Sequence, residues 1–415
     1  MGSLADFLKK FFLNKGHHVF VSLLIAKICA FLGALFIIRI LPESEFGTTS
    51  IAASVFAVFA PFSGFGSQQS LLRFGSVIND ISEKKSLSRY LFLKGFGYQV
   101  LLAFIFLGIS FFYIRKYEDI LLMFLFFAVR LIGFYFFNHI QSELRILGNN
   151  REFARVNNVV NISGVVLLLV LSFFFGLKGY LFAIAITPFL SLFWYKKENR
   201  SSDAENFSFA QKEIWNYGLH AAGTALLSDM LFSADVLLLS FLMDETAVAN
   251  YKTALLIPSN ITFLALTFLQ TDFPVIAGNY QNKEYLKNYI FNYYKIFIPI
   301  TVIIFGTSCI FSREILTLFF GSRYQDNTYI FVILSGAFCL NMLFRNLYGN
   351  MLSAVGVMKA NTTVSTLAIL LLVILSLIIV PEYGINGMAF SMALSLIFTG
   401  FATMFYFIRY IRKLK

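Results

Sequence analysis

Residues 148–185 read GNNREFARVNNVVNISGVVLLLVLSFFFGLKGYLFAIA, and residues 356–393 read GVMKANTTVSTLAILLLVILSLIIVPEYGINGMAFSMA. A shift of 208 in residue number, about half the length of the chain, lays the second stretch on the first without a gap. Gly176 then matches Gly384, and in each stretch this glycine lies between two apolar runs of spanning length. The sequence therefore predicts an internal repeat of about half the chain.

Two further matches occur in the same order at a shift of about 200 in residue number. SEKKSLSRYL near residue 83 resembles QNKEYLKNYI near 282, and LPESEFG near 41 resembles MDETAVANY near 243. The matched positions are mostly glycine and charge, so shared apolar composition does not account for them. Six spans in each half give both halves the same orientation, which is the organisation of an alternating-access transporter.

Composition points to the same class of protein. Of 415 residues, 58% are hydrophobic and 13% charged, and the mean hydropathy is +0.74, which excludes a soluble globular enzyme. We predict an all-α integral membrane protein of about 12 transmembrane helices in two six-helix lobes, residues 1–200 and 201–415. The apolar stretches lie at 17–40, 47–67, 92–114, 119–140, 157–176, 179–195, 216–242, 253–277, 291–312, 328–350, 362–381 and 386–408.

The basic residues predict the orientation of these spans. Lys and Arg number 21 in the loops on the side of the N-terminus and six on the opposite side, which places both termini in the cytoplasm. The net charge of +11 is thus a topology signal, and no nucleic-acid partner is predicted. The first eighteen residues mix lysines with Phe and Leu, a pattern typical of a short helix on the membrane surface.

Six cations lie inside predicted spans. Lys94 and Lys295 lie near span ends, as do Arg39 and, less clearly, Arg345, so these side chains can reach the interface. Lys27 and Arg130 lie about ten residues, or roughly 15 Å, from the nearer end. A cation at that depth costs about 2.5–3.5 kcal/mol, which implies either anion binding in a central cavity or an ion pair with an acid across the lobe interface.

Acids inside the spans belong to the second half. Asp229 and Asp235 lie in the seventh span and Asp272 nearer a cytoplasmic end. The first two are separated by about 120° around a helix, which argues against a metal-binding pair. A role in ion or proton coupling and a plain structural role, with backbone or arginine partners, both remain open.

Motifs for cofactor chemistry are missing from the sequence. None of the four histidines has a partner at zinc spacing, and neither a Walker phosphate loop nor a G-x-S-x-G elbow occurs. No metal, no cofactor and no enzymatic activity are predicted.

The order of several loose motifs resembles one family. RILPESEFGTTSIAASVFAVFAPFSGFGSQQSLLRFG from Arg39, ELRILGNNREFARVN from Glu143, SADVLLLSFLMDETAVANYKTA from Ser233 and YGINGMAF from Tyr383 resemble bacterial polysaccharide flippases of the Wzx type. These belong to the multidrug/oligosaccharidyl-lipid/polysaccharide exporter superfamily. The resemblance covers nearly all of the chain and implies the two-lobed fold of the related drug exporters (MATE-like).

The resemblance also implies a function. Such proteins move an oligosaccharide linked to undecaprenyl pyrophosphate from the inner to the outer leaflet of the bacterial cytoplasmic membrane, for O-antigen, capsule or another surface polysaccharide such as lipopolysaccharide. Polymerase and chain-length proteins of the same pathway are candidate partners. The cation-lined cavity of the family maps onto Lys27 and Arg130 and, less securely, onto Arg39 and Arg345.

Two rival functions fit the sequence less well. An integral glycan polymerase would show a large outer loop with acids or histidines for general base work, but the longest outer loop here, about residues 313–327, holds only Glu314 and Asp326. A drug exporter of the same superfamily that binds cations would need an acid-lined cavity, whereas the excess inside the spans is basic.

Overall fold

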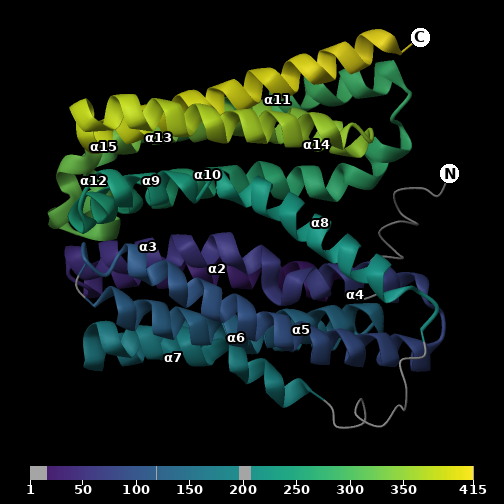
Figure 1. The fold of residues 1–415 in the computed structure, drawn as a ribbon. Coiled ribbons are helices and arrows are strands. Elements are labelled where there is room, and N and C mark those ends of the chain that lie inside the picture. The colour runs from purple at the N-terminus through teal and green to yellow at the C-terminus, as the bar shows by residue number, and fades with distance from the viewer. Residues whose placement is uncertain (1–15, 118, 196–206, 415) are drawn as a thin grey trace. The chain divides into compact units, whose positions relative to one another are not determined.

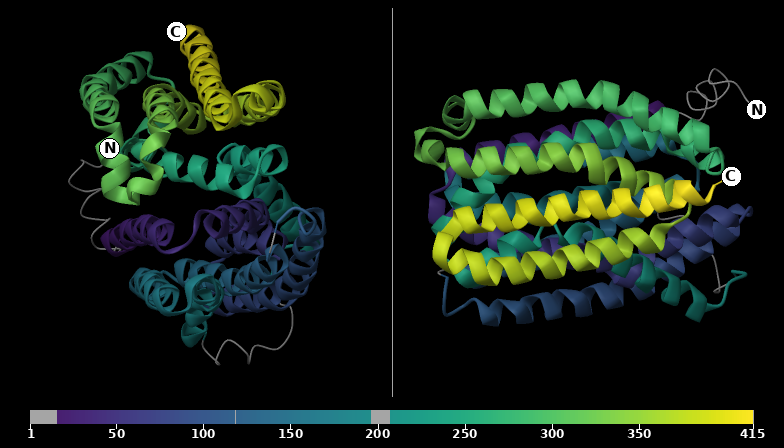
Figure 2. Two further views of the ribbon diagram at one scale, coloured as in Figure 1. Left: turned by 90° about the vertical axis from the view of Figure 1, so that its left-hand side faces the viewer. Right: turned by 90° about the horizontal axis from the view of Figure 1, so that it is seen from above.

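The computed structural model describes residues 16–117, 119–195 and 207–414. The segment predicted to lie on the membrane surface falls mostly in residues 1–15, outside the described residues. Throughout the described ranges the secondary structure is helical, and the long helices of each half run nearly parallel or antiparallel to one another (Figures 1 and 2).

The helices of the first half overlap the six predicted spans, and several of them extend beyond the predicted limits. They are α2 (Gly16–Ile40), α3 (Glu43–Phe59), η1 (Ala60–Gly66), α4 (Ser67–Val77), α5 (Ile81–Ile109), η2 (Ser110–Phe112), α6 (Ile120–Ile146), α7 (Asn150–Ile186) and η3 (Thr187–Trp194).

The second half repeats this order with more interruptions. Its helices are α8 (Gln211–Met230), α9 (Ala234–Leu242), α10 (Glu245–Gly278), α11 (Lys283–Ile310), α12 (Ser312–Phe320), η5 (Ser322–Asn327), α13 (Thr328–Asn341), η6 (Met342–Asn346), α14 (Leu347–Ala354) and α15 (Met358–Lys413).

Two of the longest helices are hairpins. α7 is broken at Gly176 (φ 56°, ψ −135°) and α15 at Gly384 (φ 57°, ψ −137°), conformations that glycine adopts without a Cβ penalty. A Cβ on Gly387 would lie 2.7 Å from the carbonyl oxygen of Ile379, so the two arms touch beside the turn. The right-hand view of Figure 2 shows α15 turning back on itself.

Counting these hairpins accounts for the twelve predicted spans. Within the described residues, eight helices are long and apolar enough to cross a membrane. Both hairpins are among them and contain two spans each, while α8 with α9 and α10 cover the predicted spans 216–242 and 253–277. The chain is a multi-span membrane protein, as the composition predicts.

The helix boundaries confirm the internal repeat and locate its single change of register. α5 begins after Asp80 and α11 after the matching Asn282, and each of these side chains accepts the backbone N–H three residues on, an N-cap that satisfies an orphan donor. At these caps the residue numbers differ by 202, whereas from α6 and α13 onward they differ by 208, because α12 and η5 lengthen the preceding loop of the second half. The predicted repeat is therefore confirmed.

The chain folds into two compact units. The first comprises Met1–Glu45 and Val55–Leu226, and the second Phe46–Ser54 and Leu227–Lys415. Each has an apolar core of its own: Leu71, Leu87 and Ile214 are fully buried in the first, and Tyr293, Met342 and Phe407 in the second. The functional division near residue 200 stays a prediction.

Candidate functional site

Arg130 lies near the middle of α6, inside unit 1. Its guanidinium carbon lies 5.1 Å from the ring centre of Phe56 and 5.7 Å from that of Phe127, close enough for cation–π attraction. Its Nε atom is buried and has no hydrogen-bond partner. Within the described part of the chain no carboxylate lies in salt-bridge range of Arg130, so its charge is not neutralised by an acid there.

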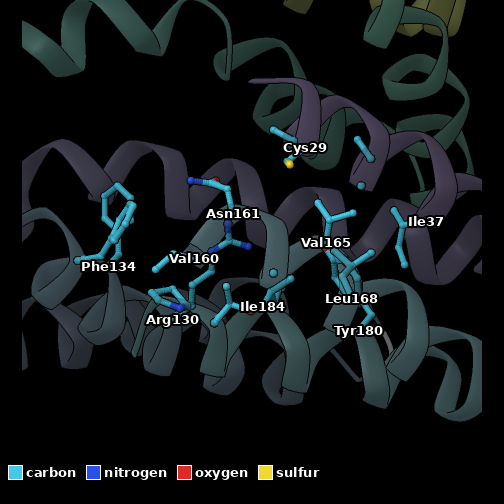
Figure 3. A pocket seen from close by; sticks show the side chains of 17 residues that line it. Cys29, Ile37, Arg130, Phe134, Val160, Asn161, Val165, Leu168, Tyr180 and Ile184 are labelled. Carbon is cyan, nitrogen blue, oxygen red and sulfur yellow. The ribbon is translucent and has the colours of Figure 1, made fainter. Parts of the chain in front are cut away.

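A cavity of about 320 Å³ opens beside this guanidinium. Its walls come from α2, α6, both arms of α7 and the start of η3, and Figure 3 shows the side chains that surround it. The polar groups on the walls are the Cys29 thiol, the Asn161 amide, the Tyr180 phenol, the Thr187 hydroxyl and Arg130 itself. The lining contains no acidic side chain, so the cavity suits an anion.

Small residues create the space. Ala30, Gly33 and Ala34 line the cavity from α2, and their spacing of three and four places them on one face of the helix. On the opposite wall a Cβ on Gly133 would lie 2.7 Å from the Phe189 ring. η3 therefore packs directly against the α6 backbone, which brings Thr187 and Pro188 to the cavity.

A chain of amides holds Asn161 in place. The Asn161 Nδ2 donates to the backbone oxygen of Asn157 at 2.8 Å and to its Oδ1 at 3.2 Å. Asn157 in turn donates to the carbonyl of Ser22 on α2, and its Oδ1 accepts from Gln141 on α6. The helices α2, α6 and α7 are thereby fixed in one register beside the cavity, and Asn161 keeps its Oδ1 for another partner.

The two other predicted cations of unit 1 do not line the cavity. Lys27 is an exposed residue of α2, two helical turns before Ala34, so the two share a helix face about 10 Å apart along the axis. Arg39 is exposed in the last turn of α2 and is turned about 140° from Ala34. Both residues make interactions of their own.

Arg345 belongs to unit 2. It lies in the π-helical turn η6, and its guanidinium carbon is 5.0 Å from the ring centre of Phe232. A π-helical turn inside a long α-helix often marks a functional position. Of the four predicted cations, Arg130 alone contributes to the cavity of unit 1.

The two aspartates of the seventh span separate in the structure. Asp229 lies on α8, but its side chain is outside the described residues. Asp235 is fully buried at the start of α9. Its carboxylate accepts the Val236 backbone N–H at 2.7 Å and the Tyr251 hydroxyl at 2.9 Å, so Asp235 has local partners that stabilise it.

Sequence reasoning missed Asn161 and Tyr180 as lining residues. The available signal was the repeat: the matching positions of the second half hold Ile369 and Met388. Where a polar residue in one half matches an apolar residue in the other, the two halves are expected to differ in function at that position.

Comparison with solved structures defines the class of fold. An inward-facing multidrug resistance MATE family transporter of the MOP superfamily superposes with a TM-score of 0.72 at 15% identity, covering 95% of this chain and 98% of the other. The lipid II flippase MurJ in an inward closed conformation gives a TM-score of 0.71 at 15% identity, with 94% and 89% covered. At such identity the likeness shows the fold, which is the MATE-like fold expected from the sequence.

The sequence comparisons then give the family. Residues 13–278 match the model of the family described as polysaccharide biosynthesis protein, and the chain belongs to that family. A relative from Haloferax volcanii, the probable low-salt glycan biosynthesis flippase Agl15, is 21% identical over 259 residues, 62% of this chain. The matched region spans about half (54%) of that relative. The predicted membership of the polysaccharide exporter superfamily is confirmed.

Proposed function

We propose that the protein is a flippase that carries a lipid-linked oligosaccharide across the membrane by alternating access. The family match and the named activity of the Haloferax relative support the class of activity. The observation that carries the proposal for this chain is the cavity beside Arg130, whose positive charge has no acidic partner among the described residues.

The physical task of such a protein is to shield a charged head group from hydrocarbon. A diphosphate left in the membrane interior would keep none of its hydration, so its transfer needs compensating positive charge. A guanidinium offers several donors in a planar fork and binds two phosphoryl oxygens at once. We propose that Arg130 performs this role and that Lys27, on the cavity-lining face of α2, supplies a second cation along the path.

The cargo and setting follow from the resemblance of the sequence. We propose that the lipid is undecaprenyl pyrophosphate, that the glycan is a surface polysaccharide repeat unit, and that both termini lie in the cytoplasm of a bacterium. The lobes that rock against each other correspond to residues 1–200 and 201–415. Arg39 and Arg345 are weaker members of the basic path, and Asp229 and Asp235 are candidates for ion coupling.

A cationic drug is a less suitable cargo. The likeness to the MATE transporter shows the fold, and the lining of the described cavity has a basic residue and no acidic one. Electrostatic complementarity therefore favours an anion over a cation.

The test is a flipping assay with purified full-length protein in proteoliposomes loaded with undecaprenyl-diphosphate-linked sugar. Arg130→Gln is expected to slow the appearance of sugar at the outer leaflet by about ten- to a hundredfold, the equivalent of one lost charged hydrogen bond. Arg130→Lys should retain part of the rate. The control is Arg151→Gln, the same change at an exposed residue in the first turn of α7. No flipping by the unmodified protein would reject the proposed function.

A further inference from the structure

The two halves of the repeat hold different residues at several matching positions around the cavity of unit 1. Residue numbers shift by 202 between α2 and its counterparts α8 and α9, and by 208 between α6 and α7 and the helices from α13 to α15. These shifts assign every residue that lines the unit 1 cavity a counterpart in unit 2.

Three polar cavity residues of unit 1 have apolar counterparts, whereas Thr187 corresponds to Ser395 and the apolar Phe137 to Arg345. Arg130 corresponds to Phe338, Asn161 to Ile369 and Tyr180 to Met388. The counterparts are 1%, 9% and 0% exposed. These three positions are therefore apolar and buried in unit 2, whereas in unit 1 they are polar and line a cavity.

The small residues differ in the same direction. Ala30 corresponds to Phe232, and the Phe232 ring lies against that of Phe338 with centroids 6.2 Å apart. Phenylalanines therefore meet in unit 2 where an alanine and Arg130 line the cavity of unit 1. Arg345, the counterpart of the cavity residue Phe137, lies against the same ring, with its guanidinium carbon 5.0 Å from the Phe232 centre.

An open cavity beside an unneutralised guanidinium destabilises the half that contains it. A cavity forfeits packing contacts for the atoms that line it, and a buried polar atom without a partner keeps its desolvation penalty. Unit 1 retains both features. Ligand binding gives unit 1 a reason to retain a cavity beside a buried cation.

The wall chemistry defines the ligand. Arg130 offers donors only. Asn161 has its Nδ2 engaged by Asn157 and so offers the acceptor Oδ1 to a hydroxyl. Phe134 and Phe137 supply apolar faces against which the C–H face of a sugar ring can pack. The volume of about 320 Å³ equals that of about ten water molecules, which exceeds a bare inorganic ion and lies at the lower end of small-ligand sites.

We propose that unit 1 by itself holds a binding site for a sugar phosphate, with the phosphoryl group on Arg130 and a sugar hydroxyl on the Asn161 Oδ1. The inference rests on the proposed function, since the sugar next to the diphosphate of the cargo is the group that would enter. It goes further by placing the site inside one half of the repeat and by naming the groups that recognise it.

Cys29 provides a direct readout, because its thiol lines the cavity. In a Cys309→Ser background, which removes the exposed cysteine while the remaining Cys339 is buried, the rate of Cys29 alkylation by N-ethylmaleimide is measured on purified full-length protein. Glucose 1-phosphate at about four times its Kd should slow alkylation about fivefold. Inorganic phosphate at the same concentration should protect markedly less, and Arg130→Gln should remove protection.

Either of two results overturns the inference. Equal alkylation rates with and without glucose 1-phosphate would show that no sugar phosphate enters the cavity. Equal protection by inorganic phosphate would show a site for a bare anion.

A second set of variants tests the location of the site. Ala30→Phe and Asn161→Ile introduce the residues of unit 2, and each should reduce the shift in Tm that glucose 1-phosphate produces by more than half. Leu32→Phe is the control, since Leu32 is a 38% exposed residue of α2 that does not line the cavity. An undiminished shift in Ala30→Phe and Asn161→Ile would place the ligand elsewhere.

The outcomes separate this inference from the proposed function. Protection of Cys29 without flipping by the unmodified protein would retain the site and reject the flippase. Flipping that is unaffected by Ala30→Phe and Asn161→Ile would retain the flippase and reject the site.

Discussion

Gly176 and Gly384, which occupy matching positions in the two halves of the chain, have nearly the same backbone conformation, with φ of 56° and 57° and ψ of −135° and −137°. Each turns the chain between two membrane-length helices. The repeat is therefore a repeat of backbone geometry, and not of apolar composition alone.

These two glycines should be sensitive to substitution. At positive φ with ψ near −135° a side chain is strained by about 1–3 kcal/mol, so Gly176→Ala and Gly384→Ala should each lower the Tm of the purified protein. Gly108→Ala is the matched control, because that glycine has no neighbour within 4 Å of an added Cβ and a negative φ. Unchanged melting of both turn variants would contradict the reversal seen at these residues.

Lys27 is expected to matter less than Arg130. It shares the cavity-lining face of α2 but does not itself line the cavity, so Lys27→Gln should slow flipping by a few-fold, against about ten- to a hundredfold for Arg130→Gln. The same proteoliposome assay measures both variants. A larger effect at Lys27 than at Arg130 would shift the main anion contact toward the start of α2.

Asp235 should contribute to stability through Tyr251. Asp235→Ala leaves the Tyr251 hydroxyl and the Val236 N–H without their buried acceptor, which should cost about 1–3 kcal/mol for each unsatisfied group. Tyr251→Phe removes the tyrosine hydroxyl and should cost less, about 0.5–1.5 kcal/mol. Thermal unfolding checks both. If Asp235→Asn melted normally yet abolished flipping, a coupling role would outweigh the structural one.

The proposed orientation predicts which loops an impermeant thiol reagent reaches in intact cells. With Cys309 replaced by serine, Ser322→Cys at the start of η5 should be labelled and Lys212→Cys at the start of α8 should not; both native residues are exposed. Labelling of Lys212→Cys only after permeabilisation supports cytoplasmic termini. The reverse pattern would invert the topology.

Spans, turns and repeat were predictable because their causes are local. An apolar run of about 20 residues must be helical in a membrane to satisfy its backbone, and a glycine between two such runs allows the reversal. The depth of Arg130 in its span could be predicted for the same reason. The exact register between the two halves of the repeat could not be predicted, since the longer loop of α12 and η5 changes the shift in residue number from 202 to 208.

The sequence by itself determined that Arg130 is a cation buried in a membrane span, because run length and position along a helix are properties of one segment. Only the tertiary structure decided that Arg130, Asn161 and Tyr180 share a cavity while Arg39 lies outside it. Which faces of α2, α6 and α7 meet depends on packing between these segments, on hydrogen bonds such as that from the Asn157 amide to the Ser22 carbonyl and on the close approach at Gly133. No single helix carries that information.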